Sequence, residues 1–173
     1  MSQLQLQTVA FDSSLIERLC CSKQHSLFAL LDSCDEPMVL SKVCDLGSNA
    51  VSLYRGNAER ELMMIAPYLI NVRRVEFEWI VEKLDGTPWG YFVSTPRGIT
   101  LTALRKHFRK FLLVEGPQGE ELYFRFYDPR VIVDFLESAT PEERDLFFGP
   151  IDTIFVNQQD GLIAVKRSSL VRP

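Results

Sequence analysis

Apolar residues recur along the chain with two periods, one typical of strands and one typical of helices. Residues 27–31 (Leu-Phe-Ala-Leu-Leu) are continuously apolar, which predicts a strand covered on both faces. Apolar residues at helical spacing over 77–84 and 99–111 predict amphipathic helices with one side toward the core. The same patterns predict strands at 50–54, 68–72 and 89–94, and helices at 37–47 and 58–65.

Turn and capping residues organise the second half of the chain. They predict two β-hairpins, each with a Gly-containing turn, and two helices that begin with a capping residue followed by proline. The hairpins join 112–114 to 122–127 through Gly116-Pro117-Gln118-Gly119, and 151–156 to 162–165 around Asp160-Gly161. The helix starts are Asp128-Pro129 and the capping box Thr140-Pro141-Glu142-Glu143.

These elements predict an α/β fold of the mixed α+β kind. We expect a single compact domain with a central mixed sheet, flanked by helices, and two β-hairpins in the second half. Residues 1–25 are expected to be an N-terminal lead-in with a short helix capped by Asp12 or Ser13, and residues 26–173 the rest of the domain. The 173 residues are 46% hydrophobic and include twelve Phe, which is ample for one core without disulfides.

The charge balance narrows the class of partner. The formal net charge is −4, which argues against a protein that coats nucleic acid. The longest apolar runs fall far short of the ~20 residues of a membrane-spanning helix. The N-terminus lacks the basic start and apolar stretch of a signal peptide, so we expect a cytoplasmic protein with no nucleic-acid or membrane partner.

The cysteines do not form a recognisable metal site. A zinc site needs knuckle-like spacing, and none occurs, so no metal and no cofactor are expected. In a reducing compartment the cysteines are expected to be thiols. The residues considered are Cys20, Cys21, His25, Cys34 and Cys44.

Support for catalysis is sparse. The chain has no nucleophile-elbow, zinc-protease or phosphate-loop motif, so no catalytic residues are expected. His25 and His107 are its two near-neutral bases, and a small hydrolase or transferase that uses one of them stays an alternative. His107 has basic neighbours on its helix and is expected to be solvated.

One predicted helix is strongly basic. Between Arg97 and Lys110 there are five Arg or Lys residues and no acid. Four of them stand in pairs at i,i+4, on neighbouring sides of the helix. The surface is either a docking patch for an acidic partner or a solvated outer face, and the residues leave both open. The four are Arg105, Lys106, Arg109 and Lys110.

The most distinctive segment is 123–130 (Tyr-Phe-Arg-Phe-Tyr-Asp-Pro-Arg). On a strand, alternation would put Phe124 and Phe126 on one face and Arg125 on the other. An arginine between tyrosines can stack on their rings and bond a carboxylate or backbone carbonyls. The segment therefore either pins the corner between strand and helix or presents a recognition surface.

The chain resembles the effector chaperones, or adaptors, of bacterial type VI secretion systems, known as Tap or TEC. The resemblance covers roughly 26–155, in order and without large gaps, and rests on six blocks. These are 27–32; 52–56 with 61–62 and 66–69; Trp89-Gly90 with Ser94; 104–111; 123–131; and 147–151.

The resemblance implies a non-enzymatic adaptor in the bacterial cytoplasm. Such proteins bind a toxic effector and help load it onto a VgrG-type spike protein. Many members continue into a second lobe implicated in gripping the effector, whereas this chain stops at Pro173. Three explanations are compatible with that length: the hold on the effector is reduced, it is supplied elsewhere, or the chain is a fragment that lacks the second lobe. The candidate partner-binding residues are Arg105, Lys106, Arg109, Lys110, Tyr54, Arg55, Arg125, Tyr127 and Arg130.

Overall fold

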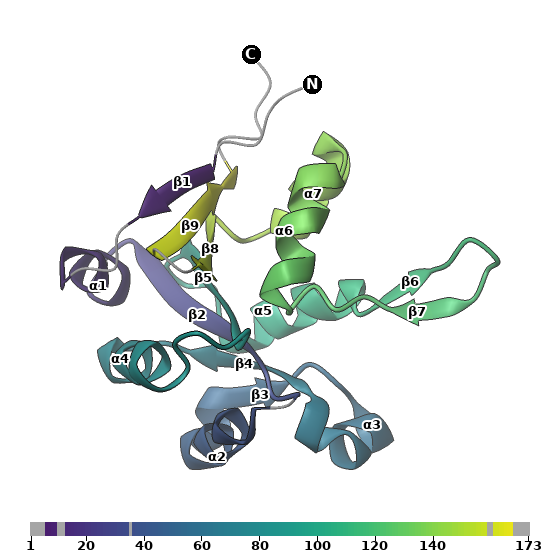
Figure 1. The fold of residues 1–173 in the computed structure, drawn as a ribbon, viewed down its shortest axis with the longest axis horizontal. Coiled ribbons are helices and arrows are strands. Elements are labelled where there is room, and N and C mark those ends of the chain that lie inside the picture. The colour runs from purple at the N-terminus through teal and green to yellow at the C-terminus, as the bar shows by residue number, and fades with distance from the viewer. Residues whose placement is uncertain (1–5, 10–12, 35, 159–160, 168–173) are drawn as a thin grey trace.

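A seven-stranded sheet runs through the middle of the molecule (Figure 1). The computed structural model describes residues 6–9, 13–34, 36–158 and 161–167. The long interior strand β2, which we call the central strand, lies between β5 and β4, so both of its edges are hydrogen-bonded. The strands, in sheet order, are β1 (Leu6–Val9), β9 (Gly161–Lys166), β8 (Thr153–Gln158), β5 (Gly90–Pro96), β2 (His25–Asp32), β4 (Pro67–Asn71) and β3 (Ala50–Ser52).

Helices cover both faces of the sheet (Figure 1). On one face lie α1 (Ser13–Cys20), α2 (Pro37–Leu46) and α4 (Arg74–Lys83). On the other lie α5 (Leu101–Phe108), α6 (Pro129–Ser138) and α7 (Pro141–Phe148). Because β2 is covered on both sides, residues 27–31 are all buried, as predicted. The remaining helical segments are α3 (Gly56–Glu61), η1 (Gly47–Asn49), η2 (Met63–Ile65) and η3 (Arg109–Phe111).

The expected class, a single mixed α+β domain, is confirmed. The expected mixed sheet is wrong in strand direction, because every described neighbouring pair is antiparallel. The connection from β2 through α2 would place β3 parallel to β2 if the two were neighbours. Instead β4 enters between them and pairs antiparallel with both.

Residues 6–9 fall in the expected lead-in, yet they form the edge strand β1. β1 pairs antiparallel with β9, with Leu6 opposite Val165. This pairing joins the two ends of the described chain, and the local pattern does not show which strand β1 pairs with. The expected cap residue Asp12 and turn residue Asp160 lie outside the described residues.

The predicted hairpin in the middle of the chain is present but shorter than expected. β6 (Leu113–Glu115) pairs with β7 (Glu121–Tyr123) as a separate two-stranded sheet. The expected second strand, 122–127, is too long, because the chain leaves the hairpin after Tyr123. Phe126 then turns into the core, where its ring stacks on Phe108 with centroids 5.5 Å apart.

Both predicted helix starts are confirmed. The Asp128 side chain accepts the Arg130 N–H at 2.9 Å, and Pro129 is the first residue of α6. The Thr140 hydroxyl accepts the Glu143 N–H, and the Glu143 carboxylate accepts the Thr140 N–H, as a capping box requires. These caps position α6 and α7 against the aromatic core.

Gly90 is the first residue of β5 and lies directly opposite Leu31 of β2. A Cβ atom at this position would lie 1.9 Å from the Leu30 carbonyl oxygen, and the backbone φ is +132°. Both the space and the backbone angle therefore favour glycine. The close approach aligns β5 with the central strand, which fixes Trp89 and the end of β2 relative to each other.

Replacing Gly90 by Ala is expected to lower the free energy of unfolding by about 3 kcal/mol or more, from backbone strain plus a clash. Gly86→Ala is the matched control, since Gly86 also has a positive φ (+74°) but has nothing within 4 Å of a Cβ. It should lose about 1 kcal/mol. Urea unfolding measures both, and equal losses would contradict the close-approach argument.

Candidate functional site

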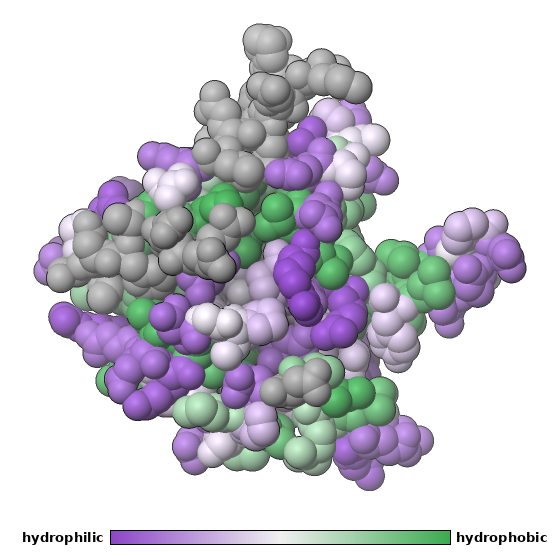
Figure 2. Space-filling model, in the orientation of Figure 1, coloured by the Kyte–Doolittle hydropathy of each residue, from purple (hydrophilic) through white to green (hydrophobic). Residues whose placement is uncertain are grey.

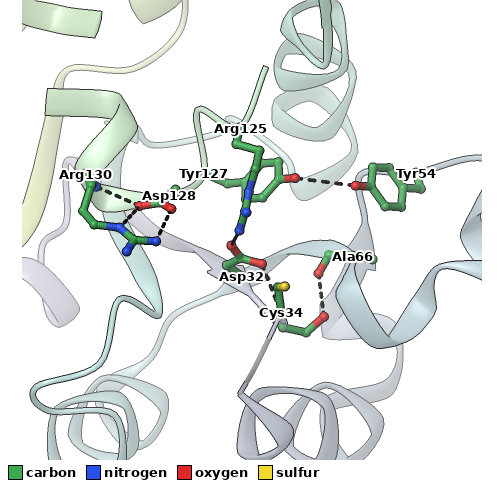
Figure 3. Close-up of polar contacts among 9 residues, drawn as sticks. Asp32, Cys34, Tyr54, Ala66, Arg125, Tyr127, Asp128 and Arg130 are labelled. Carbon is green, nitrogen blue, oxygen red and sulfur yellow. Dashed lines mark hydrogen bonds and ion pairs between the residues drawn. The ribbon is translucent and has the colours of Figure 1, made fainter. Parts of the chain in front are cut away.

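The carboxylate of Asp32 lies at the end of β2 and joins distant parts of the chain. Its side chain is only 5% exposed. One oxygen accepts from Arg125 Nη2 at 2.7 Å, and the other accepts the Cys34 N–H at 3.0 Å (Figure 3). The next residue, Ser33, donates its hydroxyl to the Ala66 carbonyl at 2.8 Å. These bonds fix the corner where the chain leaves the central strand.

Arg125 connects this corner to a pair of tyrosines. Its guanidinium lies over the Tyr127 ring, 5.8 Å from the centroid, so the predicted stacking and carboxylate contact are both present. The Tyr127 and Tyr54 hydroxyls are 3.5 Å apart and buried (Figure 3). Burial, followed by the contact with Tyr54, raises the pKa of Tyr127 above its usual value. The hydrogen bond to Asp32 raises the pKa of Arg125 further above its ordinary range.

A second arginine–carboxylate pair stands at the start of α6. Arg130 donates to Asp128 through Nε at 2.9 Å and Nη2 at 2.6 Å (Figure 3). Burial acts to raise the pKa of Asp128, but the hydrogen bonds from Arg130 outweigh it, so the pKa is lowered. The Arg130 side chain is largely exposed. It is therefore available to a partner, unlike the carboxylate that holds it.

Two arginines of the basic helix point inward, to the loop after β3. Arg105 donates from Nε to the Ser52 carbonyl at 2.6 Å and from Nη2 to Glu59 at 2.9 Å. Arg109 donates from Nε to the Leu53 carbonyl at 2.7 Å, and both arginines donate to the Tyr54 carbonyl. We call this arrangement the arginine clamp. Burial, and then the charge of Arg105, lowers the pKa of Arg109.

The clamp divides the four basic residues into two kinds. Arg105 and Arg109 are partly buried and satisfy backbone carbonyls, whereas Lys106 and Lys110 are exposed. The charge of Arg105 is opposed by Glu59, which lies far away in the sequence. The surface charge of this helix therefore comes chiefly from its two lysines.

His107, expected to be solvated, is buried in the core. Its Nε2 lies 2.7 Å from the Phe147 carbonyl oxygen. The ring fills the space beside Gly149, where an added Cβ would come within 2.3 Å of the imidazole. Burial lowers the pKa of His107 despite the bond to Phe147. The ring thus contributes to packing between α5 and α7.

His25 lies near the surface between a serine and an aspartate. Ser22 Oγ is 3.4 Å from its Nδ1, and Asp152 Oδ2 is 3.5 Å from its Nε2. The same serine oxygen accepts the backbone N–H groups of Gln24 and His25, at 3.2 and 3.0 Å. Ser22 therefore closes a turn after α1, and an oxygen engaged in this way is poorly placed as a nucleophile.

No disulfide joins Cys20, Cys21, Cys34 and Cys44, all of which are described. Burial, and then the adjacent Cys21, raises the pKa of Cys20 to about 11, which keeps it protonated at neutral pH. Within the described ranges, no group of three His, Cys, Asp or Glu side chains could hold a metal ion. None of the described helices combines the length and the apolar content needed to cross a membrane.

A groove of about 1020 Å³ lies between α6, the loop before β5 and the sheet strands β8 and β9. Its apolar lining includes Val133 and Ile163, and its charged lining includes Asp85, Asp134 and Arg130. The groove brings Arg130 next to residues of β8 and β9, which no pattern in the sequence indicated.

These features define a small α+β domain in which arginines are held by a buried carboxylate, two tyrosines and backbone carbonyls, and in which Lys106 and Lys110 are exposed. Residues 27–146, more than half of the chain, match the family described as Domain of unknown function (DUF4123). The chain therefore belongs to that family, which is associated with adaptors that load effectors of type VI secretion systems. Comparisons with curated proteins and with solved structures give no match.

Sequence reasoning missed Asp32 and the carbonyls of Ser52, Leu53 and Tyr54 as partners of the arginines. A signal for Asp32 was present, because a carboxylate directly after a continuously apolar strand is buried and needs a donor. The carbonyls carry no such signal, since every residue has one.

Replacing Asp32 by Asn keeps the size of the side chain and removes its charge. We expect the free energy of unfolding to fall by about 1–2 kcal/mol, because a charged hydrogen bond is lost while solvent still reaches the guanidinium. Urea unfolding of Asp32→Asn, Arg125→Gln and the double variant measures the coupling energy. The Asp128–Arg130 pair, with its more exposed arginine, should give a smaller coupling. Purely additive losses at Asp32 and Arg125 would contradict this account.

The buried His107 predicts a pH dependence of stability. In the unfolded chain a histidine takes up a proton near pH 6.5, whereas the folded chain keeps His107 neutral to lower pH. The unfolded state binds more protons in that window, so the free energy of unfolding should fall as the pH drops below about 6.5. Urea unfolding across the range from about pH 7 to about pH 5 should show a shallower loss in His107→Gln than in wild type. Parallel pH profiles would rule the effect out.

Proposed function

We propose that this protein is a non-enzymatic adaptor of the bacterial cytoplasm, which binds a toxic effector and helps load it onto a VgrG-type spike protein. The observation that carries the proposal is the family match over 27–146, which runs from the central strand β2 into α7. The matched range contains the Asp32–Arg125 pair and the arginine clamp. The family is associated with the loading of effectors, and we propose the effector and the VgrG-type spike protein as the two partners.

The candidate site residues take two roles in this proposal. Side chains held by internal contacts shape the surface, and exposed cations contact the partner. The positioning residues are Arg105, Arg109, Arg125, Tyr54 and Tyr127, and the contact residues are Arg55, Lys106, Lys110 and Arg130.

The lysines of α5 and η3 suit an acidic patch on a folded partner. Lys106 and Lys110 are four residues apart and exposed, and the arginine clamp holds their helical segment rigidly against the loop after β3. A rigid positive surface on a protein of net charge −4 orients an approaching partner as well as attracting it. We assign this surface to the spike protein, because two rigid surfaces can dock without the entropy cost of ordering a flexible segment.

The alternative, a small enzyme that uses His107 or His25, gains little from the geometry. His107 is buried, and the oxygen of Ser22 beside His25 is engaged by two backbone donors. Turnover that disappears in His25→Ala would favour that alternative.

The test is a pull-down of the tagged protein from its native cells, with the bound proteins identified by mass spectrometry. We expect the wild type to recover a spike protein and an effector. Lys106→Glu/Lys110→Glu should recover less spike protein, by about tenfold, because two attractive charges become repulsive. Arg105 and Arg109 are poor choices for this test, since their replacement breaks the clamp.

Lys23→Glu/Lys83→Glu is the matched control, because it makes the same change in net charge at exposed positions elsewhere. It should recover wild-type amounts. Recovery of neither partner by a folded wild type would overturn the adaptor function. If both lysine variants recover equal amounts of the spike protein, only the assignment of Lys106 and Lys110 to the spike protein is contradicted.

A further inference from the structure

The β6–β7 hairpin is a two-stranded sheet that projects from the body of the protein (Figure 1). Leu113 lies opposite Tyr123, and Val114 lies opposite Leu122. No third strand pairs with either strand among the described residues. Both outer edges therefore carry backbone N–H and C=O groups that a further strand can pair with.

The hairpin exposes apolar side chains on both of its faces. Four of its six strand residues are large and apolar, and their exposed fractions lie between 41% and 57%. Because side chains alternate along a strand, the two cross-strand pairs lie on opposite faces. Figure 2 shows hydrophobic colour over the base of this arm and hydrophilic colour toward its tip. An isolated hairpin of this kind is only marginally stable in water, so a partner that covers it would stabilise it.

The hairpin is also acidic. Residues 112–124 include Glu115, Glu120 and Glu121 and no Lys or Arg. Glu115 and Glu121 are directly opposite each other, a like-charge pair that destabilises the free hairpin. A basic segment alongside would relieve this repulsion. A second copy of the hairpin would instead bring six carboxylates together, so self-association is disfavoured.

We propose that the β6–β7 hairpin is the docking arm for the effector. It binds an extended effector segment by β-strand addition, and that segment alternates apolar side chains with Lys or Arg. Main-chain hydrogen bonds form at the hairpin edge, apolar side chains cover Val114 and Leu122, and the cations meet Glu115 and Glu121. An extended segment belongs to a chain that is free to adopt a strand, which suits cargo rather than a folded spike. The inference rests on the proposed adaptor function.

The acidic arm and the basic lysine surface would then hold different partners. Strand addition needs an unpaired edge, which the arm has, and docking of a rigid surface needs a fixed helix, which Lys106 and Lys110 occupy. Opposite charges keep the two partners from exchanging sites. Loading requires both proteins to be held at once, so two separate surfaces fit the proposed role.

The experiment compares effector recovery by the wild type and by two hairpin variants in the native-cell pull-down. Val114→Thr/Leu122→Thr reduces apolar area while keeping strand propensity at position 114 and placing a β-branched residue at 122. Glu115→Lys/Glu121→Lys reverses the charge. Each is expected to lower the recovered effector at least about tenfold while leaving the recovered spike protein unchanged. Higher salt should reduce wild-type recovery of the effector.

Two matched controls report non-specific effects. Val75→Thr changes an exposed apolar residue on α4, and Asp45→Lys/Glu137→Lys makes the same charge change on α2 and α6. Both should recover wild-type amounts of effector. If the charge control loses the effector as strongly as the hairpin variant does, the hairpin assignment is overturned, because net charge alone then explains the loss.

A second measurement uses the wild-type complex and does not depend on how the variants fold. Amide hydrogen exchange at 113–115 and 121–123 should slow at least about tenfold when the co-purified effector is bound, because an edge gains a hydrogen-bonded strand. Unchanged exchange in a complex that contains the effector would overturn the docking arm and leave the adaptor function standing. A wild type that recovers neither partner overturns the function itself. If the wild type is a dimer in solution and the hairpin variants are monomers, the partner of the hairpin is a second copy of this chain and not the effector.

Discussion

The buried carboxylate of Asp32 holds the two halves of the chain together. It ends the central strand, and the guanidinium it binds comes from Arg125, 93 residues later in the sequence. That guanidinium covers Tyr127, whose hydroxyl faces the hydroxyl of Tyr54 in the loop after β3. One acidic side chain, nearly removed from water, therefore determines how the base of the hairpin, the start of α6 and the loop after β3 meet.

The arginine clamp completes the same structure from the other side. Arg105 and Arg109 donate to the carbonyls of Ser52, Leu53 and Tyr54, at and just after the end of β3. The four basic residues of this helical segment therefore have two roles. Arg105 and Arg109 hold the loop after β3, whereas Lys106 and Lys110 are exposed to solvent. The exposed lysines and the acidic hairpin are what remain for partners, and their opposite signs favour two binding events on one small domain.

Local patterns predicted most elements because each depends on neighbours in the sequence. The continuous apolar run of β2, the caps at Asp128 and Thr140, and the turn between β6 and β7 are all present. The stacking of Arg125 on a tyrosine was also predictable, since the two are two residues apart. The errors arose where a distant contact overrode the local pattern: His107 has basic neighbours but packs on Gly149, and the strand pattern of 122–127 ends early because Phe126 joins the core.

The amino-acid sequence by itself determined the mixed α+β class, most of the elements after β1 and the family resemblance, because these follow from periodicity, capping and short motifs. Only the tertiary structure decided which strands are neighbours, which arginines are held internally and where the exposed charges lie. The insertion of β4 between β2 and β3 and the pairing of β1 with β9 are choices among long-range contacts of similar local propensity. Spacing along one element shows which side a residue occupies, but the group that it meets there depends on how the whole chain folds back on itself.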